Sequence, residues 1–172
     1  MKIKTWEIAK LTNGLPIDYI EDLKHLFNDN KQIEQISPVH VTGLASKLAK
    51  EYTVKGTVTV ELKIQCSRCL THYHYRLKND FAEIFIQSSE ELAVLGDNVT
   101  MLDSDEIDLS PVVEEAVILA IPLAPVCSIE CKGLCYECGI DLNRHSCDCE
   151  TNKINPKFAD LAKLFDQTTK TE

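Results

Sequence analysis

The sequence has no apolar run long enough to cross a membrane. Its longest apolar block, residues 117–126, contains two prolines and is much shorter than the roughly 20 residues that a membrane-spanning helix needs. The first residues also lack the apolar stretch of a secretory signal. We therefore expect a soluble cytoplasmic protein. In the cytosol disulfides are rare, so close cysteine pairs point to metal binding or redox chemistry.

The patterns of common catalytic sites are missing as well. The sequence contains no histidine cluster, no glycine-rich loop for phosphate and no nucleophile elbow. Glu114 and Glu115 are adjacent on an expected helix and diverge by about 100°, so they do not form a convergent carboxylate pair. A metal-dependent nuclease is therefore disfavoured, and we expect a protein that is not an enzyme and has no catalytic residues.

Charge is distributed unevenly along the chain, whose formal net charge is −9. Residues 44–81 contain seven Lys or Arg against three Asp or Glu, whereas residues 82–126 contain ten acids and no base. A basic face on an acidic protein can still attract phosphate. The alternative is that the two stretches pair with each other or with water, and the sequence leaves both interpretations open.

The clearest local pattern is a strict alternation of apolar and polar residues from Val54 to Cys66. It indicates a long, half-buried strand with Cys66 on its apolar side. The alternation resumes after Cys69, with Tyr73 and Tyr75 on the apolar parity, which predicts a returning antiparallel strand. We therefore expect Cys66 and Cys69 at or near a hairpin turn.

Weaker patterns indicate other elements near the N-terminus and around the hairpin. After Pro16, apolar residues recur at helical spacing, which predicts a short amphipathic helix over residues 17–27. A break in strand structure is expected at Gly43. Further strand-like pieces occupy residues 39–44, 48–54 and 81–86.

The second half of the chain contains two helix signals. Ser110 and Pro111 predict the start of a helix that ends before Pro122. Asn155 and Pro156 give the same start signal for a C-terminal helix. Before these helices, residues 88–108 have the composition of a long acidic loop.

Six of the eight cysteines fall within 23 positions near the C-terminus. Zinc favours four thiolates in a tetrahedron, and cysteines two to four residues apart can present two ligands to one ion. Cys135 and Cys138 fit this geometry, and Gly139 behind them can turn the chain past the metal. A pair separated by one residue can also chelate from an irregular loop. The preferred tetrad is Cys135, Cys138, Cys147 and Cys149.

Four cysteines remain for a second structural zinc: Cys66, Cys69, Cys127 and Cys131. A reduced pair without metal at Cys66 and Cys69 is the alternative, while redox catalysis is disfavoured because this pair does not precede a helix. His145 could replace one thiol, and an iron–sulfur cluster uses similar ligands. Cysteine-only ligands favour closed structural sites, so we expect one or two structural zinc ions.

Four segments of the chain carry a family resemblance: IQCSRCL at residues 64–70, IDLSPVVEE at 107–115, CKGLCYECGIDLN at 131–143 and INPKFADL at 154–161. Together they resemble the YceD family of bacteria and plastids, which is linked to accumulation of large-subunit ribosomal RNA. The resemblance implies a non-enzymatic factor in ribosome assembly that acts on or near 23S ribosomal RNA or its precursor. Some family members carry the first cysteine pair without the C-terminal cluster, which implies that the cluster stabilises this branch.

The first functional hypothesis is binding of ribosomal RNA, or of a pre-ribosomal particle, through the polar side of the hairpin. Aromatic residues make up only 6% of the chain, and Tyr73 and Tyr75 lie on the apolar parity. We therefore expect recognition of the RNA backbone or shape and little base stacking. The candidate residues are Lys55, Lys63, Arg68, His72, His74, Arg76 and Lys78.

A second hypothesis is a protein-interaction module, in which the acidic residues 83–115 engage a basic large-subunit ribosomal protein. A solvated acidic loop is the plain alternative.

Together the patterns predict an α+β fold with a twisted antiparallel sheet or partial β-barrel, packed helices and a small cysteine-rich zinc-binding C-terminal segment. We expect the sheet domain over residues 1–122, including the acidic loop at residues 88–108. The cysteine-rich segment and the final helix would occupy residues 123–172.

Overall fold

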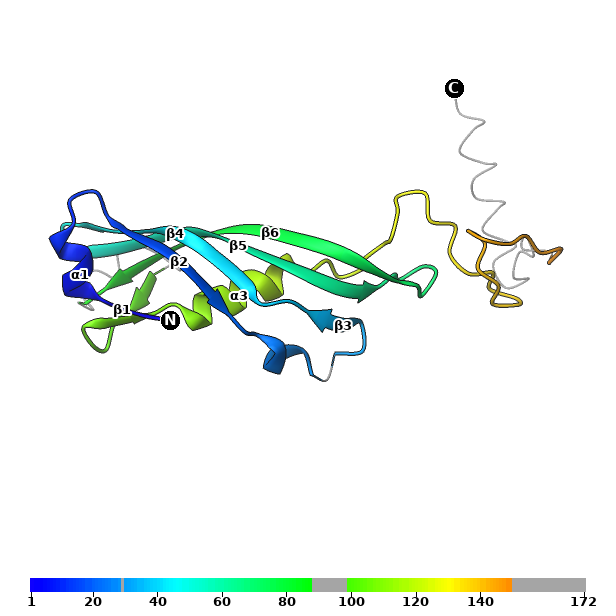
Figure 1. The fold of residues 1–172 in the computed structure, drawn as a ribbon, viewed down its shortest axis with the longest axis horizontal. Helices are drawn as coiled ribbons and strands as arrows, with labels where there is room; N and C mark the ends of the chain where they lie inside the picture. The colour runs from blue at the N-terminus through cyan, green and yellow to red at the C-terminus, as the bar shows by residue number, and fades with distance from the viewer. Residues whose placement is uncertain (29, 88–98, 150–172) are drawn as a thin grey trace, which may run out of the picture. The chain divides into compact units, whose positions relative to one another are not determined.

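The computed structural model describes residues 1–28, 30–87 and 99–149, which divide into two compact units. The first unit contains residues 1–67 and 71–127. The second contains residues 68–70 and, within the described chain, residues 128–149. Figure 1 shows that the first unit is a twisted sheet with helix α3 lying along it.

The long hairpin predicted from the alternating pattern is confirmed. Strand β5 spans Glu51–Gln65 and strand β6 spans His72–Ile86, and the two pair antiparallel over their whole length. Alternate residues of β5 are buried from Val58 to Ile64, because every second side chain points to the core face of the sheet. The piece expected at residues 81–86 is the end of β6.

The other strands extend this hairpin into an open sheet. Its order is β2-β4-β5-β6-β7, with β3 paired to β5, and every pairing is antiparallel except that of β6 with β7. These strands are β2 (Leu15–Glu21), β3 (Ile33–Ile36), β4 (Val39–Leu48) and β7 (Val99–Met101). A separate pair joins β1 (Lys2–Lys4) to β8 (Glu106–Asp108), and α1 covers Thr5–Lys10. The predicted α+β class is confirmed, with a sheet that does not close.

The amphipathic helix expected over residues 17–27 is wrong. Those residues form β2 and a short 3-10 helix, η1 (Lys24–Phe27). Ile17 is 2% exposed, whereas Ile20, which the helix would have buried beside it, is 71% exposed. Seven residues of β2 pair with β4, and this long-range pairing overrides the helical spacing of the apolar residues.

The strand break expected at Gly43 is also wrong, since β4 continues through this residue. The chain turns instead at residues 49–50, within the strand expected at residues 48–54. Gly43 lies opposite Gly56 of β5, and Gly56 lies opposite Phe81 of β6. A Cβ on Gly56 would stand 2.7 Å from the Phe81 ring and 2.7 Å from the Thr42 carbonyl oxygen. The glycines therefore allow the strands and the aromatic ring to approach closely.

Helix α3 (Ser110–Ala120) starts and ends where the sequence predicts. Val113, Ala116 and Val117 are buried in the core, and the Asn79 side chain of β6 donates a hydrogen bond to the Ala116 carbonyl at 3.0 Å. In the described part of the chain, no helix combines the length and apolar character needed to span a membrane.

Two expectations fall wholly or partly outside the described residues. The C-terminal helix from residue 155 lies entirely outside them. Residues 88–98 of the expected acidic loop also lie outside, and the described remainder includes β7 and β8. The division at residues 122 and 123 stays a prediction.

We expect Gly56→Ala to lower the free energy of unfolding by about 1–3 kcal/mol, because the added methyl group overlaps the Phe81 ring and the Thr42 carbonyl. Urea unfolding followed by circular dichroism measures this loss. The control is Thr59→Val on the outer side of the same strand, which should change stability by less than about 0.5 kcal/mol. Equal stability of Gly56→Ala and wild type would contradict the tight approach at this position.

Candidate metal centres and basic sheet face

The four cysteines of the preferred tetrad lie together in the second unit. The sulfur atoms of Cys135, Cys138, Cys147 and Cys149 are all within 4.8 Å of one another. Four thiolates at about 2.3 Å from a tetrahedral zinc ion lie about 3.8 Å apart, so the cluster has nearly the dimensions of such a site. This cluster could hold a metal ion.

A tight turn presents the first two cysteines of this tetrad. The Gly139 N–H donates to the Cys135 carbonyl at 2.8 Å, and the Cys135 N–H donates to the Ile140 carbonyl at 2.9 Å. Gly139 has a φ of +73°, which L side chains rarely adopt, so glycine is suited to the turn behind the cysteine pair.

The thiols of this tetrad influence one another's ionisation. Hydrogen bonds from the backbone N–H groups of Cys138 and Glu137 lower the pKa of the Cys135 thiol to about 7. A hydrogen bond with the Cys138 side chain, together with burial, raises the pKa of Cys149 to about 12. Backbone donors thus stabilise a thiolate at Cys135, whereas hydrogen bonds among the thiols, together with burial, favour the protonated form of Cys149. A bound cation would favour deprotonation of all four thiols.

The remaining four cysteines, Cys66, Cys69, Cys127 and Cys131, make up a second cluster that could hold a metal ion. In the first unit, the Cys127 N–H donates to the Cys66 sulfur at 3.4 Å, and the Ser67 N–H donates to the Pro125 carbonyl at 2.8 Å. The turn after β5 is thereby joined to the segment that follows α3, which explains how cysteines about 60 residues apart in sequence meet.

Arg68, a predicted RNA contact, has structural partners in the second unit. Its Nη1 donates to the carbonyls of Cys131 at 3.0 Å and Ile129 at 3.3 Å, and its own carbonyl accepts from the Leu134 N–H at 3.1 Å. Arg68 therefore fastens the loop around Cys131. Its charge alone could not have indicated this role, because carbonyl partners leave no sequence pattern.

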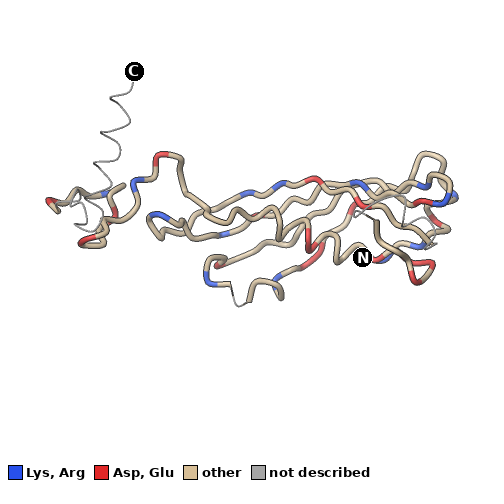
Figure 2. The backbone as a smooth tube through the Cα atoms, turned by 180° about the vertical axis from the view of Figure 1, so that it is seen from behind, with Lys and Arg blue, Asp and Glu red and all other residues tan. Residues whose placement is uncertain are grey.

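The other predicted RNA contacts lie on the outer face of the hairpin. Lys55, Arg76 and Lys78 are exposed, and so are His72 and His74, because their parity is opposite to that of the core residues. Tyr73 and Tyr75 are partly buried against the core, as their parity predicts. Figure 2 shows Lys and Arg positions spaced along these strands.

Acidic side chains neutralise part of this face. Glu34 accepts a hydrogen bond from Lys63 at 2.9 Å and lies 3.6 Å from His72, and the Lys63 bond lowers the pKa of Glu34. Glu61 stands opposite Arg76 in the hairpin. Within the described residues, Lys55, His74, Arg76 and Lys78 form no ion pair. The cations available to a ligand are therefore fewer than the sequence suggests.

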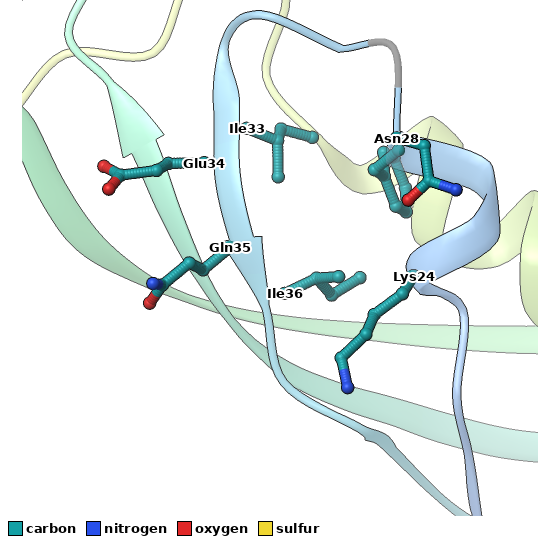
Figure 3. A pocket seen from close by; sticks show the side chains of 7 residues that line it. Lys24, Asn28, Ile33, Glu34, Gln35 and Ile36 are labelled. Atoms are coloured by element: carbon teal, nitrogen blue, oxygen red, sulfur yellow. The ribbon is translucent and has the colours of Figure 1, made fainter.

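A hollow of about 480 Å³ lies between η1 and β3. Figure 3 shows Ile33 and Ile36 directed toward η1, while Glu34 and Gln35 point away from that side. Its described lining therefore lacks a convergent acid, base and nucleophile of the kind that catalysis requires.

Comparison with known proteins assigns the family. Residues 54–165 match the family described as large ribosomal RNA subunit accumulation protein YceD. The chain belongs to the YceD family. The predicted family resemblance is thereby confirmed.

Several relatives match different shares of the chain. The protein YlbN of Bacillus subtilis is 32% identical over 167 residues, which are 94% of this chain and 96% of YlbN. The large ribosomal RNA subunit accumulation protein YceD of Haemophilus influenzae is 30% identical over 47% of this chain and 48% of its own length. The chloroplastic YCED homolog 1 of Arabidopsis thaliana is 34% identical over 39% of this chain and 21% of its own length. No solved structure matches the chain.

We expect Arg68→Met to speed amide hydrogen exchange in residues 129–134 about tenfold, because the loop loses charge-assisted hydrogen bonds while the side-chain stem is kept. Hydrogen exchange followed by mass spectrometry measures this change. Arg144→Met, an exposed arginine of the same unit, is the matched control and should leave these amides unchanged. Identical exchange in the two variants would contradict a fastening role for Arg68.

Proposed function

We propose that the protein is a non-enzymatic factor that supports processing or accumulation of 23S ribosomal RNA by binding its precursor through the outer face of β5 and β6. Membership of the YceD family supports the biological role, since curated relatives carry the name of large ribosomal RNA subunit accumulation proteins. The proposal places the protein in the cytoplasm, with a pre-ribosomal particle as its partner.

The observation that carries RNA binding is the set of exposed cations on one face of a rigid hairpin. Lys55, Arg76 and Lys78 project from paired strands, and no described acid pairs with them. The aromatic residues nearest to them face the core, so base stacking contributes little. Such a face suits contacts with phosphates, and the candidate contacts also include Lys63, His72 and His74 of the same strands and Arg68 of the segment that follows β5.

We further propose that both cysteine clusters hold structural zinc. Their ligands are thiols alone, with no described carboxylate or histidine in either cluster, which is typical of closed four-coordinate sites. In the described part of the second unit, the buried hydrophobic side chains are all cysteines: Cys69, Cys131 and Cys135. A unit without an apolar core needs another source of stability, and four-thiolate zinc sites supply it.

The acidic segment supports a second candidate function, binding of a basic large-subunit ribosomal protein. Asp103, Asp105, Glu106 and Asp108 are all exposed within a few residues of one another. In the described chain none of these four acids forms an ion pair with Lys or Arg, and the ion pair of Asp108 is with the Met1 amino group at 3.8 Å. A cationic protein segment would complement these charges.

We expect purified protein to contain close to two zinc ions per chain and to lose the order of residues 128–149 when a strong chelator removes them. Mass spectrometry of metals gives the content, and hydrogen exchange reports the order. Iron with visible absorption would indicate an iron–sulfur cluster. A zinc content near one would contradict the two-site proposal, and a value near zero would contradict zinc altogether.

We expect binding of a 23S precursor fragment to weaken with salt, with a slope of log K against log salt of about −2 to −3. This range corresponds to three phosphate contacts, each contributing about 0.7–0.9. Arg76→Glu combined with Lys78→Glu should make this slope shallower by about 1.4–1.8. Filter binding across a salt series measures both slopes.

The matched control for this charge reversal is Lys10→Glu combined with Lys31→Glu, two exposed lysines outside the hairpin, which should keep the wild-type slope. Equal slopes in both double variants would contradict RNA binding through this face. A ribosomal protein that stays bound after nuclease treatment, and is released by charge reversal at residues 103–108, would favour the second candidate.

A further inference from the structure

Asn143, whose residue type alone predicts no role, makes hydrogen bonds to two separate segments of the second unit. Its Oδ1 accepts from the Lys132 N–H at 2.8 Å, and its Nδ2 donates to the Cys131 sulfur at 3.5 Å. The same Nδ2 donates to Asp141 at 2.7 Å. One side chain therefore joins the loop that carries Cys131 to the segment after the Cys135 and Cys138 turn.

The position of Asn143 depends on backbone pairing between the two segments that flank the Cys135 and Cys138 turn. Leu134 and Asp141 form a β-bridge, and the Leu142 N–H donates to the Gly133 carbonyl at 3.0 Å. The Asn143 N–H also donates to the Asp141 carboxylate at 3.0 Å, and these bonds from Asn143 hold the pKa of Asp141 below its usual value. An Asp-x-Asn turn of this kind is the sequence signal that could have revealed the site.

The turn then leads directly to the last two ligands of the tetrad. The N–H groups of Arg144 and His145 donate to the Asp141 carbonyl at 3.1 and 3.0 Å, and Cys147 follows two residues later. A metal ion bound by Cys135, Cys138, Cys147 and Cys149 would close the chain on both sides of this turn. The loop that carries Asn143 would then be held at both ends.

A hydrogen bond donated to a metal-binding thiolate orients the sulfur and stabilises its negative charge. Cys131 receives such a bond from Asn143, and the Arg68 guanidinium fixes the carbonyl of the same residue. Cys131 itself is only 5% exposed, so water has little access to its sulfur and the N–H donated by Asn143 can stabilise the thiolate.

We infer that Asn143 is a positioning residue for Cys131 and couples the two metal clusters, so that metal in the Cys135 tetrad raises the affinity of the cluster that contains Cys131. The inference rests on the proposed zinc sites. It adds that the two sites are coupled and that Asn143 carries the coupling. Because coupling between binding sites is reciprocal, each cluster favours filling of the other.

The test measures zinc affinity of the full chain by competition with a chromophoric chelator. Asn143→Asp keeps the acceptor for Lys132 but replaces the N–H donor with an anionic oxygen beside the Cys131 sulfur. Asn143→Ala removes both. Loss of a hydrogen bond to a metal ligand costs about 10- to 100-fold in metal affinity. Because Asn143 is exposed, we expect a loss of about tenfold, at the site that contains Cys131. Arg144→Gln is the adjacent control; it removes only an exposed ion pair with Asp141 at 3.7 Å, which contributes little, and should bind both ions as wild type does.

Cys138→Ser tests the coupling itself, because it removes an exposed ligand of the tetrad without touching Cys131. We expect the ion that remains to bind about tenfold more weakly than in wild type, and adding Asn143→Ala to this variant to cause little further loss. Circular dichroism of the sheet confirms that each variant has kept its first unit.

The outcomes separate the two proposals. Wild type with no zinc overturns both the zinc assignment and the coupling. Wild type with two zinc ions, and Asn143 variants whose affinities at both sites stay within twofold of Arg144→Gln, overturns the role of Asn143 alone. Additive losses in the Cys138→Ser and Asn143→Ala double variant would likewise show that Asn143 does not carry the coupling.

Discussion

The pairing of β5 with β6 is the constraint on which the first unit depends. Fifteen residue pairs run without interruption from Glu51 and Ile86 to Gln65 and His72. This register decides which side chains face the core, and a slip of one residue would exchange the buried and exposed faces. The pairing stops where β5 ends at Gln65 and β6 begins at His72, and Cys66 follows directly. The position of Cys66 therefore follows from the same hydrogen bonds that define the sheet.

The same register explains why the outer face carries moderate charge. The strands place Lys78 in line with Thr59 and His40, and Arg76 opposite Glu61, so cations alternate with neutral or acidic neighbours. Glu34 of β3 then compensates Lys63. Counting charges along residues 44–81 overestimates the positive potential, because acids from β3 and from within the hairpin share the surface.

Sequence patterns predict this structure well where the residues follow a single clear spacing. The alternation over residues 54–66 has a single interpretation, and the spacing of Cys135, Cys138, Cys147 and Cys149 places them in one of the two clusters. The pattern after Pro16 is ambiguous, because four apolar residues at helical spacing cannot reveal that β4 offers a pairing partner. Gly43 looked like a break because its partner Gly56 on β5, which in turn lies opposite Phe81 on β6, is distant in sequence.

The contacts least visible in the sequence are those in the second unit, where polar side chains take the place of a core. Arg68 and Asn143 are a cation and an amide in a polar segment, and only the fold shows that they fasten the loop around Cys131. Such hydrogen bonds contribute about 1 kcal/mol each, whereas a structural zinc site contributes on the order of 10 kcal/mol. Metal binding would therefore stabilise this unit, while the hydrogen bonds decide which sulfur meets the metal. The sheet of the first unit has its own apolar core from Ile3 to Val117. Loss of metal should consequently disorder the cysteine loops while most of the basic face stays folded.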